Sequence, residues 1–217
     1  MNNFSPNIVT IIMIVASMGA ITFIVVTMTS FIKISVVMFL LRNALGIQQT
    51  PPNLVLYGIA LVLTIFISAP VMQKVFQQVQ DPSTKFETFQ DWIDLSGRAR
   101  EPVREFLIRF TRPNEREFFY AATQRVWPEE MRQTVTSSDL AILIPSFVIS
   151  ELRRAFEIGF LIYLPFIAVD LIISAILMAL GMSMVPPLTI SVPFKLFLFV
   201  SIEGWSKIFH GLVLSYG

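Results

Sequence analysis

An uncharged stretch near the N-terminus constrains the fold most. No charged residue occurs from Ile8 to Ile32, and at about 1.5 Å per residue a helix over this range exceeds the roughly 20 residues that cross a bilayer core. The preceding residues lack the basic segment and the small-residue cleavage site of a secretory signal, so we expect this stretch to be retained. The chain is therefore predicted to be an integral membrane protein.

The composition agrees with this membrane assignment. Of the 217 residues, 54% are hydrophobic and 14% are charged, whereas a soluble domain averages about 25% charged residues. The formal net charge is +1, so the chain lacks the positive field with which a nucleic-acid-binding protein neutralises phosphates. We therefore expect no nucleic acid partner.

Residues suited to catalysis or metal binding are scarce. The chain has no cysteine and a single histidine, His210, which excludes disulfides, Cys-type zinc sites and His-rich metal sites. No glycine-rich phosphate-binding loop is present, and we interpret His210 as a partly exposed interfacial residue rather than a proton relay. We therefore expect no enzyme, no cofactor and no metal ion.

The polar residues divide the chain into three parts. We predict an N-terminal hydrophobic helical hairpin over residues 1–76, a polar, water-facing helical insert over 77–139, and C-terminal hydrophobic helices with a connecting loop over 140–217. The fold class is then an all-α membrane protein, in which broken apolar helices form helical hairpins and carry an inserted polar helical domain.

The turn of the N-terminal hairpin is predicted to follow Gly46. Gly46 can end one helix, Thr50 can cap the next helix, and Pro51 suits its first turn. The second apolar run, from Leu54 to Met72, then returns across the membrane.

Basic residues between these two runs suggest an orientation. Lys33 and Arg42 have no acidic residue between them, and short cytoplasmic loops are enriched in Lys and Arg. We expect this turn in the cytoplasm and the insert outside.

Prolines mark the expected helix boundaries in the rest of the chain. Pro102 and Pro113 each precede apolar residues at helical spacing, which predicts two amphipathic helices packed together. Further on, we expect Pro165, Val185–Pro187 and Pro193 to break the apolar stretch into two helices or several half-helices.

Three ionisable residues interrupt the C-terminal apolar stretch: Glu151, Asp170 and Lys195. Charges are costly in such surroundings and tend to mark functional positions. Glu151 could instead pair with Arg154 one turn along, and Arg153 with Glu157, at spacings that merely stabilise a helix. Asp170 has no basic residue near it on its own helix, so it must find a donor across an interface or lie in a wet cavity.

Methionines cluster before the last proline pair. Met178, Met182 and Met184 precede Pro186 and Pro187. Flexible thioether side chains can line a constriction that adapts to different passengers, but methionines are also ordinary core filler. The spacing alone favours core filler.

Three long blocks resemble one protein family: Leu41–Asn53, Ser150–Leu161 and Gly181–Lys195. Together with the Asp170 segment Pro165–Leu171 and with Glu203-Gly204-Trp205, they are similar to the SctR/FliP family of bacterial type III secretion and flagellar export proteins. The resemblance covers nearly the whole chain.

The resemblance implies a core channel-forming subunit of an export gate that moves unfolded polypeptides across the bacterial inner membrane. Such a gate would be a pentamer of this chain, completed by SctT/FliR-type and SctS/FliQ-type subunits and joined to other basal-body components. The assembled gate would be raised towards the periplasm, so helices that look membrane-spanning need not cross lipid.

The resemblance also assigns roles to residues. A pore gasket would be formed by Met182, Met184 and Met178. The hinge or loop that carries the gasket would be Gly181, Pro186 and Pro187. Glu151 and Lys195 would form an inter-subunit ion pair, and Asp170 and Arg42 would be buried polar residues needed for assembly.

Two departures from the family refine this reading. Flagellar members usually begin with a cleavable signal peptide, which this sequence lacks, so we favour the virulence-type injectisome over a flagellar export gate. Ser183 interrupts the methionine run that many relatives have, which implies a thinner gasket. A secondary transporter is the alternative from another class, but such folds usually have two related halves, and none is apparent.

Overall fold

The computed structural model describes residues 8–47, 49–79, 89–182 and 184–217, and every regular element in these ranges is a helix. The helices are α1 (Ile8–Met28), α2 (Phe31–Ala44), α3 (Asn53–Val79), α4 (Phe89–Phe110), α5 (Pro113–Val126), α6 (Glu129–Arg132), α7 (Leu140–Ala179), α8 (Pro187–Ser201) and α9 (Gly204–Leu214). Gln48 and Ser183 lie outside the described residues, so the expectation about the interrupted methionine run is not addressed by the structure.

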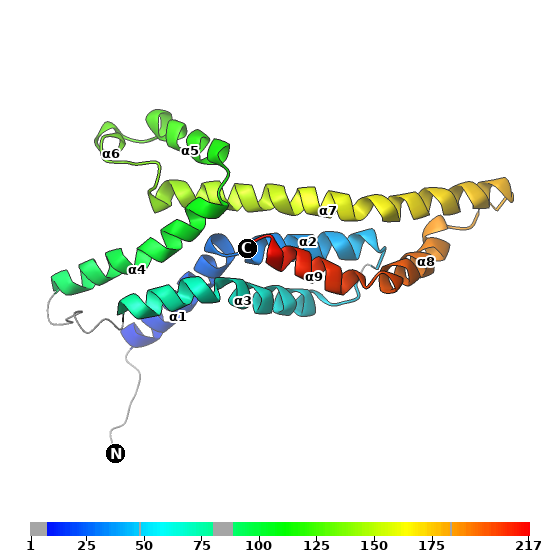
Figure 1. Ribbon diagram of the computed structural model, residues 1–217, viewed down its shortest axis with the longest axis horizontal. Coiled ribbons are helices and arrows are strands. Elements are labelled where there is room, and N and C mark those ends of the chain that lie inside the picture. The colour runs from blue at the N-terminus through cyan, green and yellow to red at the C-terminus, as the bar shows by residue number, and fades with distance from the viewer. Residues whose placement is uncertain (1–7, 48, 80–88, 183) are drawn as a thin grey trace, which may run out of the picture.

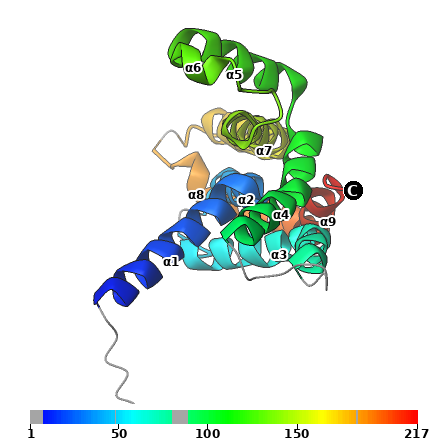
Figure 2. The ribbon, with the colours of Figure 1, turned by 90° about the vertical axis from the view of Figure 1, so that its left-hand side faces the viewer.

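Helix α7 organises the molecule. Figure 1 shows it running along most of the molecule, with α2, α3 and α9 beside its first half and α8 near its far end. Helices α5 and α6 lie on the side of α7 opposite α2 and α3, as the end-on view in Figure 2 also shows. Helices α2 and α3 are joined by a turn and contact each other, whereas the prediction paired the run Ile8–Ile32 with Leu54–Met72.

The core forms where α2 crosses α7. Ile34, Val37 and Leu41 of α2 are fully buried, and α7 presents the small residues Ala155 and Gly159 to this helix. A Cβ on Gly159 would lie 2.2 Å from a Leu40 Cδ atom. Small residues allow helix backbones to approach closely, which is how helices associate where lipid removes the hydrophobic driving force.

The first apolar run does not form one straight helix. Helix α1 covers most of the predicted run from Ile8 to Ile32, and the bend falls at its end, where Val15–Met28 and Phe31–Ala44 meet at 71°. A crossing of the membrane by this run remains a prediction. Thr29 bonds back to the Val25 carbonyl, and its Oγ1 also accepts the Phe31 amide at 3.3 Å. Hydroxyl groups that compete for backbone partners in this way bend helices.

The turn between α2 and α3 is where the sequence places it. Gly46 has φ of +77°, a left-handed conformation that favours glycine. Helix α3 begins only at Asn53, so the cap expected at Thr50 lies too early. Pro52 accepts the first backbone bonds of the helix instead.

The prolines break fewer helices than expected. Pro70, Pro102, Pro145, Pro165 and Pro193 all lie inside helices, because neighbouring helices can stabilise the freed backbone groups. The Pro186–Pro187 pair does start a helix, with Pro187 in its first turn. The break before the last helix falls instead at Glu203, which has φ of +54°, and α8 and α9 meet there at 61°.

The insert is helical, as predicted, but it is packed differently. Its helices α4 and α5 each contact α7 rather than forming an extensive contact with each other in the described part of the chain. Leu107 is fully buried, and Leu107 and Phe110 join Phe147 of α7 in one apolar cluster. The insert therefore packs one side of its helices against α7, and its exposure to water remains a prediction.

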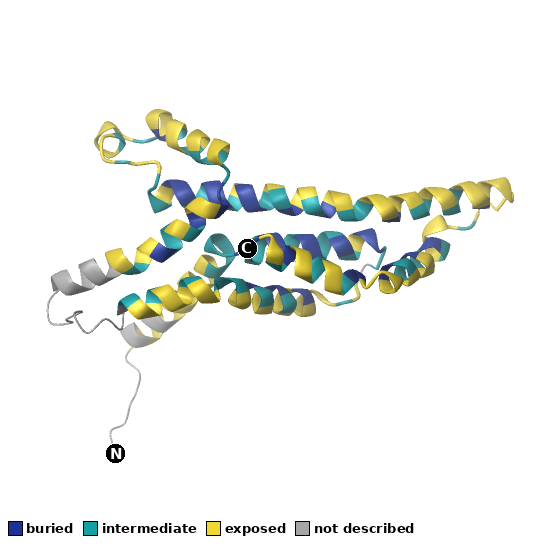
Figure 3. Ribbon diagram, in the orientation of Figure 1, coloured by how far each residue is buried: buried dark blue, intermediate teal, exposed yellow. Residues whose placement is uncertain are grey.

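The hydrophobic surface confirms the membrane class. Within the described residues, α3 and α7 are long and apolar enough to cross a membrane, and up to four spans result if each bent pair counts as one. Figure 3 shows that buried residues gather around the α2–α7 crossing, while the second half of α7 is exposed over much of its surface. The chain is an all-α membrane protein.

Candidate functional site

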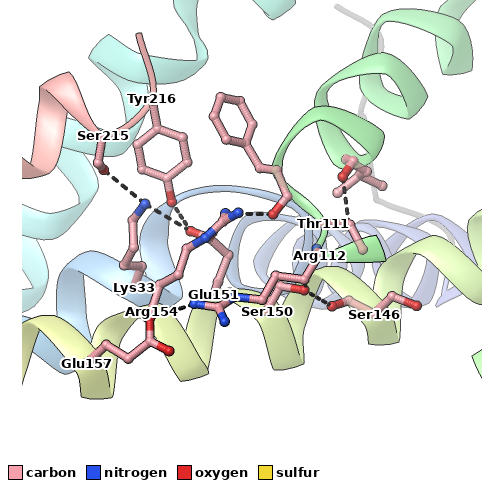
Figure 4. Close-up of polar contacts among 12 residues, drawn as sticks. Lys33, Thr111, Arg112, Ser146, Ser150, Glu151, Arg154, Glu157, Ser215 and Tyr216 are labelled. Carbon is pink, nitrogen blue, oxygen red and sulfur yellow. Dashed lines mark hydrogen bonds and ion pairs between the residues drawn. The ribbon is translucent and has the colours of Figure 1, made fainter. Parts of the chain in front are cut away.

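Glu151 lies at the centre of a buried polar cluster, here called the Glu151 cluster (Lys33, Glu151, Arg154, Ser215 and Tyr216). Its Oε1 accepts a bond from Arg154 Nη1 at 2.9 Å, and its Oε2 lies 3.4 Å from Lys33 Nζ. The Tyr216 hydroxyl also donates to Oε2. Figure 4 shows these donors converging on one carboxylate from α2, α7 and the C-terminal residues.

The centre of the cluster is shielded from solvent, while Arg154 and Ser215 lie at its more exposed edge. The side chains of Lys33 and Glu151 are 1% and 0% exposed, and Lys33 Nζ lies 3.5 Å from the centre of the Tyr216 ring. Burial, and then the negative charge of Glu151, raise the pKa of the Tyr216 hydroxyl, so this group remains a proton donor. A buried carboxylate with this set of partners is fully compensated.

The same region of α7 holds the polar insert. Arg154 Nη1 donates to the Phe110 carbonyl at 2.6 Å, and the Arg112 amide donates to Ser150 Oγ at 2.9 Å. Arg112 also pairs with Glu157 at 2.5 Å. The junction between α4 and α5 is therefore fixed to the helix turns that surround Glu151.

A second cluster joins α7, α8 and the end of α2, and we call it the Asp170 cluster (Ala44, Asp170, Ser191 and Lys195). Lys195 Nζ lies 2.6 Å from Asp170 Oδ2 and 3.1 Å from the Ala44 carbonyl oxygen. Ser191 donates to Asp170 Oδ1 at 2.6 Å. Asp170 thus finds its donors on another helix of the same chain.

Arg42 stabilises the α2–α3 turn. Its Nη1 donates to the Pro51 carbonyl at 3.3 Å and to Asn53 Oδ1 at 2.6 Å. Its guanidinium group also lies over the Phe39 ring. Within one chain, Arg42 therefore connects the end of one apolar helix to the start of the next.

The methionines lie at the exposed tip between α7 and α8. Met178 and Met184 are 69% and 93% exposed, and Met182 is 42% exposed. Gly181, with φ of +73°, ends α7, and the Met182 amide bonds to the Leu177 carbonyl, which is the Schellman pattern of a helix end. None of the three side chains fills the core of one chain.

The structure separates some residues that the resemblance links. Glu151 and Lys195 belong to different clusters, and each is paired within the chain. An inter-subunit Glu151–Lys195 pair would require both to exchange partners, and it remains a prediction. The local alternatives are present, because Glu151 pairs with Arg154 and Arg153 with Glu157.

Sequence reasoning missed Lys33 and Tyr216 as partners of Glu151. The sequence indicates only a membrane orientation for Lys33, although a lone cation beside a long apolar run also needs a buried partner. Nothing in the sequence indicates that Tyr216 contacts Glu151, because tyrosines are common at membrane interfaces whatever their partners.

The chemistry of these clusters is electrostatic. No group of three or more metal-ligating side chains occurs in the described ranges, and His210 lies in an apolar hollow beside Phe66 and Phe209. The buried charges are used to join helices. These features define a helical membrane protein with internally paired charges and an exposed apolar tip.

The chain belongs to the FliP family, whose model matches residues 12–212. It is 55% identical to "Probable translocation protein y4yL" of Sinorhizobium fredii, over 100% of this chain and 97% of that protein. It is 46% identical to "Yop proteins translocation protein R" of Yersinia pestis, over 98% of each chain. It is also 46% identical to "Virulence protein YscR" of Salmonella typhimurium, over 89% of each chain. The resemblance seen in the sequence blocks is thereby confirmed.

Proposed function

We propose that this chain is a core channel-forming subunit of a type III secretion export gate of the injectisome kind, which moves unfolded polypeptides across the bacterial inner membrane. Family membership supports this proposal, and so do relatives that carry the names translocation, virulence and harpin secretion protein. Those names favour an injectisome over a flagellar gate. The family is one of secretion apparatus proteins, which supports a structural rather than an enzymatic role.

The partners follow from the same proposal. Five copies of this chain would form the gate, with SctT/FliR-type and SctS/FliQ-type subunits around or beside them. The large exposed apolar surface of α7, including Phe160, Leu161 and Leu171, supports such an assembly, because exposed patches of this kind mark contact surfaces. In the assembled gate the subunits would be raised towards the periplasm.

The exposed methionine tip is the observation that carries the proposal. Met182 and Met184 lie on a loop rather than in the core, so several copies could direct them towards a common axis. Unbranched thioether side chains repack at low cost, and an apolar constriction excludes ions by dewetting. Such a ring would close when idle and adapt to a polypeptide in transit.

The test is a double substitution at the tip. Met182→Ala with Met184→Ala should leave the complex assembled but raise ion leakage through reconstituted gates, because it widens the constriction without changing either buried cluster. Met131→Ala is the matched control, since Met131 is also exposed but lies in the insert. Unchanged ion tightness in an assembled double variant would contradict the gasket.

A further inference from the structure

The hairpin of α7 and α8 extends from the rest of the chain like an arm (Figure 1). At its base, Phe166 is 3% exposed, whereas Leu171, Ile172 and Met178 beyond Asp170 are each more than half exposed. The position of the methionine tip therefore depends on the contacts that the α7–α8 hairpin makes with the rest of the chain near Asp170.

The Asp170 cluster lies at this base. Lys195 connects the α7–α8 hairpin to α2, because its ammonium group donates to the Ala44 carbonyl as well as pairing with Asp170. Ala44 is the last residue of α2, where carbonyls lack helical partners and the helix dipole favours a cation. The Lys195 ammonium group thus joins α8, which carries it, to both α7 and the end of α2.

Packing at the same place supports the polar contact. Lys195 and Ser191 are 2% and 0% exposed, whereas the Asp170 side chain is 35% exposed, so the two donors are buried and the carboxylate that they share is only partly so. Beside them, Gly46 lies against Val192 and Leu188 so closely that a Cβ would be 2.9 Å from Val192. The end of α2 therefore meets α8 over a short, well-defined contact.

We propose that Asp170, Ser191 and Lys195 are positioning residues that fix the direction of the α7–α8 hairpin relative to α2, and with it the place of the methionine tip. The helix from Asp170 to Gly181 is about 16 Å long, so a rotation of roughly 10° at the base moves the tip by about 3 Å. That displacement is comparable to the size of a side chain. The link to gating rests on the proposed function, whereas the positioning itself does not.

The positioning can be measured directly because the chain has no cysteine. Spin labels on introduced Leu54→Cys and Leu180→Cys would report the distance from α3 to the tip, and both positions are well exposed. The full chain, purified with its co-expressed neighbours and placed in lipid nanodiscs, would carry labelled copies diluted with unlabelled ones. Double electron–electron resonance then measures the distance between the two spin labels of one chain.

Three substitutions grade the loss of the cluster. Asp170→Leu removes the bonds of Asp170 to both Lys195 and Ser191. Ser191→Ala removes only the Ser191–Asp170 bond, and Asp170→Asn removes the negative charge but keeps an acceptor for Ser191. Loss of a bond to a charged group shifts a two-state population by roughly tenfold when the group is buried, and by less at Asp170, which is 35% exposed. Asp170→Leu should therefore give a new or broadened distance, and Asp170→Asn a smaller change. Lys74→Met is the control, because the Lys74–Glu105 pair is 60% exposed on both sides and lies away from the hairpin.

The outcomes separate the two proposals. An unchanged distance in Asp170→Leu, or in Asp170→Asn and Ser191→Ala if the Leu variant does not assemble, would overturn the positioning role whatever the gate does. A changed distance with unchanged ion leakage would support positioning and count against the methionine seal. A changed distance with raised leakage would support both, and an equal change in Lys74→Met would overturn the assignment to this cluster.

Discussion

Among the residues that the structure describes, Glu151 is the most completely buried charged residue, and its partners explain why it is tolerated. Removal of one member of a buried pair leaves an uncompensated charge and costs about 3–5 kcal/mol, whereas exposed pairs contribute about 0–1 kcal/mol. Lys33 and Glu151 are both almost fully buried, and Lys74 and Glu105 are both largely exposed. The contribution of a buried ion pair, Lys33–Glu151, can therefore be compared with that of an exposed pair, Lys74–Glu105, in one chain.

Lys33→Met should lower the stability of the subunit in detergent by several kcal/mol, because the Glu151 charge loses its partner from α2. Lys33→Met combined with Glu151→Met should recover much of the loss, since no unpaired charge remains. Unfolding followed by tryptophan fluorescence measures both effects, and Lys74→Met should be nearly neutral. If the double variant is as unstable as the sum of the two single variants, the residues are not coupled.

The predicted inter-subunit pair gives a different signature. If Glu151 exchanges Lys33 for Lys195 of a neighbouring copy on assembly, coupling between Glu151 and Lys195 would appear in pentamer yield and not in subunit stability. A charge exchange, Glu151→Lys with Lys195→Glu, that recovers no yield beyond either single change would remove support for the pairing.

At the scale of residues, the sequence predicts ion pairs only between residues that lie close together in the chain. The Glu151–Arg154 pair follows from helical spacing. Lys33 bonds to Ser215, 182 residues away, and no local pattern indicates which distant residue a buried cation will meet. The position of Glu151 as a costly charge was predictable, but its partners depend on how α2, α7 and the C-terminus pack.

At the scale of the helices, the crossing of α2 and α7 depends on the absence of a side chain. Gly159 lies against Leu40 so closely that an added Cβ would overlap it. Gly58, in the second turn of α3, has nothing within 4 Å of the same position. An added methyl group would therefore meet Leu40 at Gly159 but would have free space at Gly58.

Gly159→Ala should destabilise the chain by about 1–3 kcal/mol, because the new methyl group forces the two helices apart. Gly58→Ala should be neutral or slightly stabilising, because alanine favours a helix. The midpoint of thermal unfolding in detergent measures both. Leu40→Ala should partly rescue Gly159→Ala, and a Gly159→Ala chain as stable as the Gly58→Ala chain would contradict the close crossing.

Helix content was easier to predict than helix breaks. Hydrophobic runs and Gly46 identified the turn between α2 and α3, because both signals are local. The bend at Thr29 was missed, because hydroxyl residues also occur within straight helices. Pro165 was expected to interrupt a helix, but α7 continues through it. Whether a proline breaks a helix depends on the neighbours that pack around it.

For the whole molecule, the main feature is apolar surface that one chain cannot cover. Phe156, Phe160, Leu164 and Leu171 are exposed at helical spacing along α7, while Phe118 is similarly exposed on α5 of the insert. The first group lies on a helix apolar enough to span a membrane, and Phe118 lies on a helix of the polar insert. The two locations predict different roles in assembly.

Phe160→Gln with Leu171→Gln should reduce the yield of the multi-copy complex by tenfold or more, because each change removes apolar contact area from the surface expected to meet another copy. Phe118→Gln removes a similar apolar side chain from the insert and should leave assembly largely intact. Native mass spectrometry of the complex, purified with its co-expressed neighbours, measures copy number. A single copy in the unchanged complex would contradict the pentamer.

The length of α7 has a consequence for handling the protein. Its 40 residues extend about 60 Å, twice the roughly 30 Å of hydrocarbon in a bilayer. Even at a tilt of about 40°, the upper end of what is common, the helix spans about 46 Å along the membrane normal, so roughly a third lies beyond the lipid tails. A detergent micelle has the same limited thickness. Helices α4 and α5 already cover part of α7 within the chain, so we expect co-expressed neighbours that cover the rest to keep the chain dispersed better than a change of detergent does.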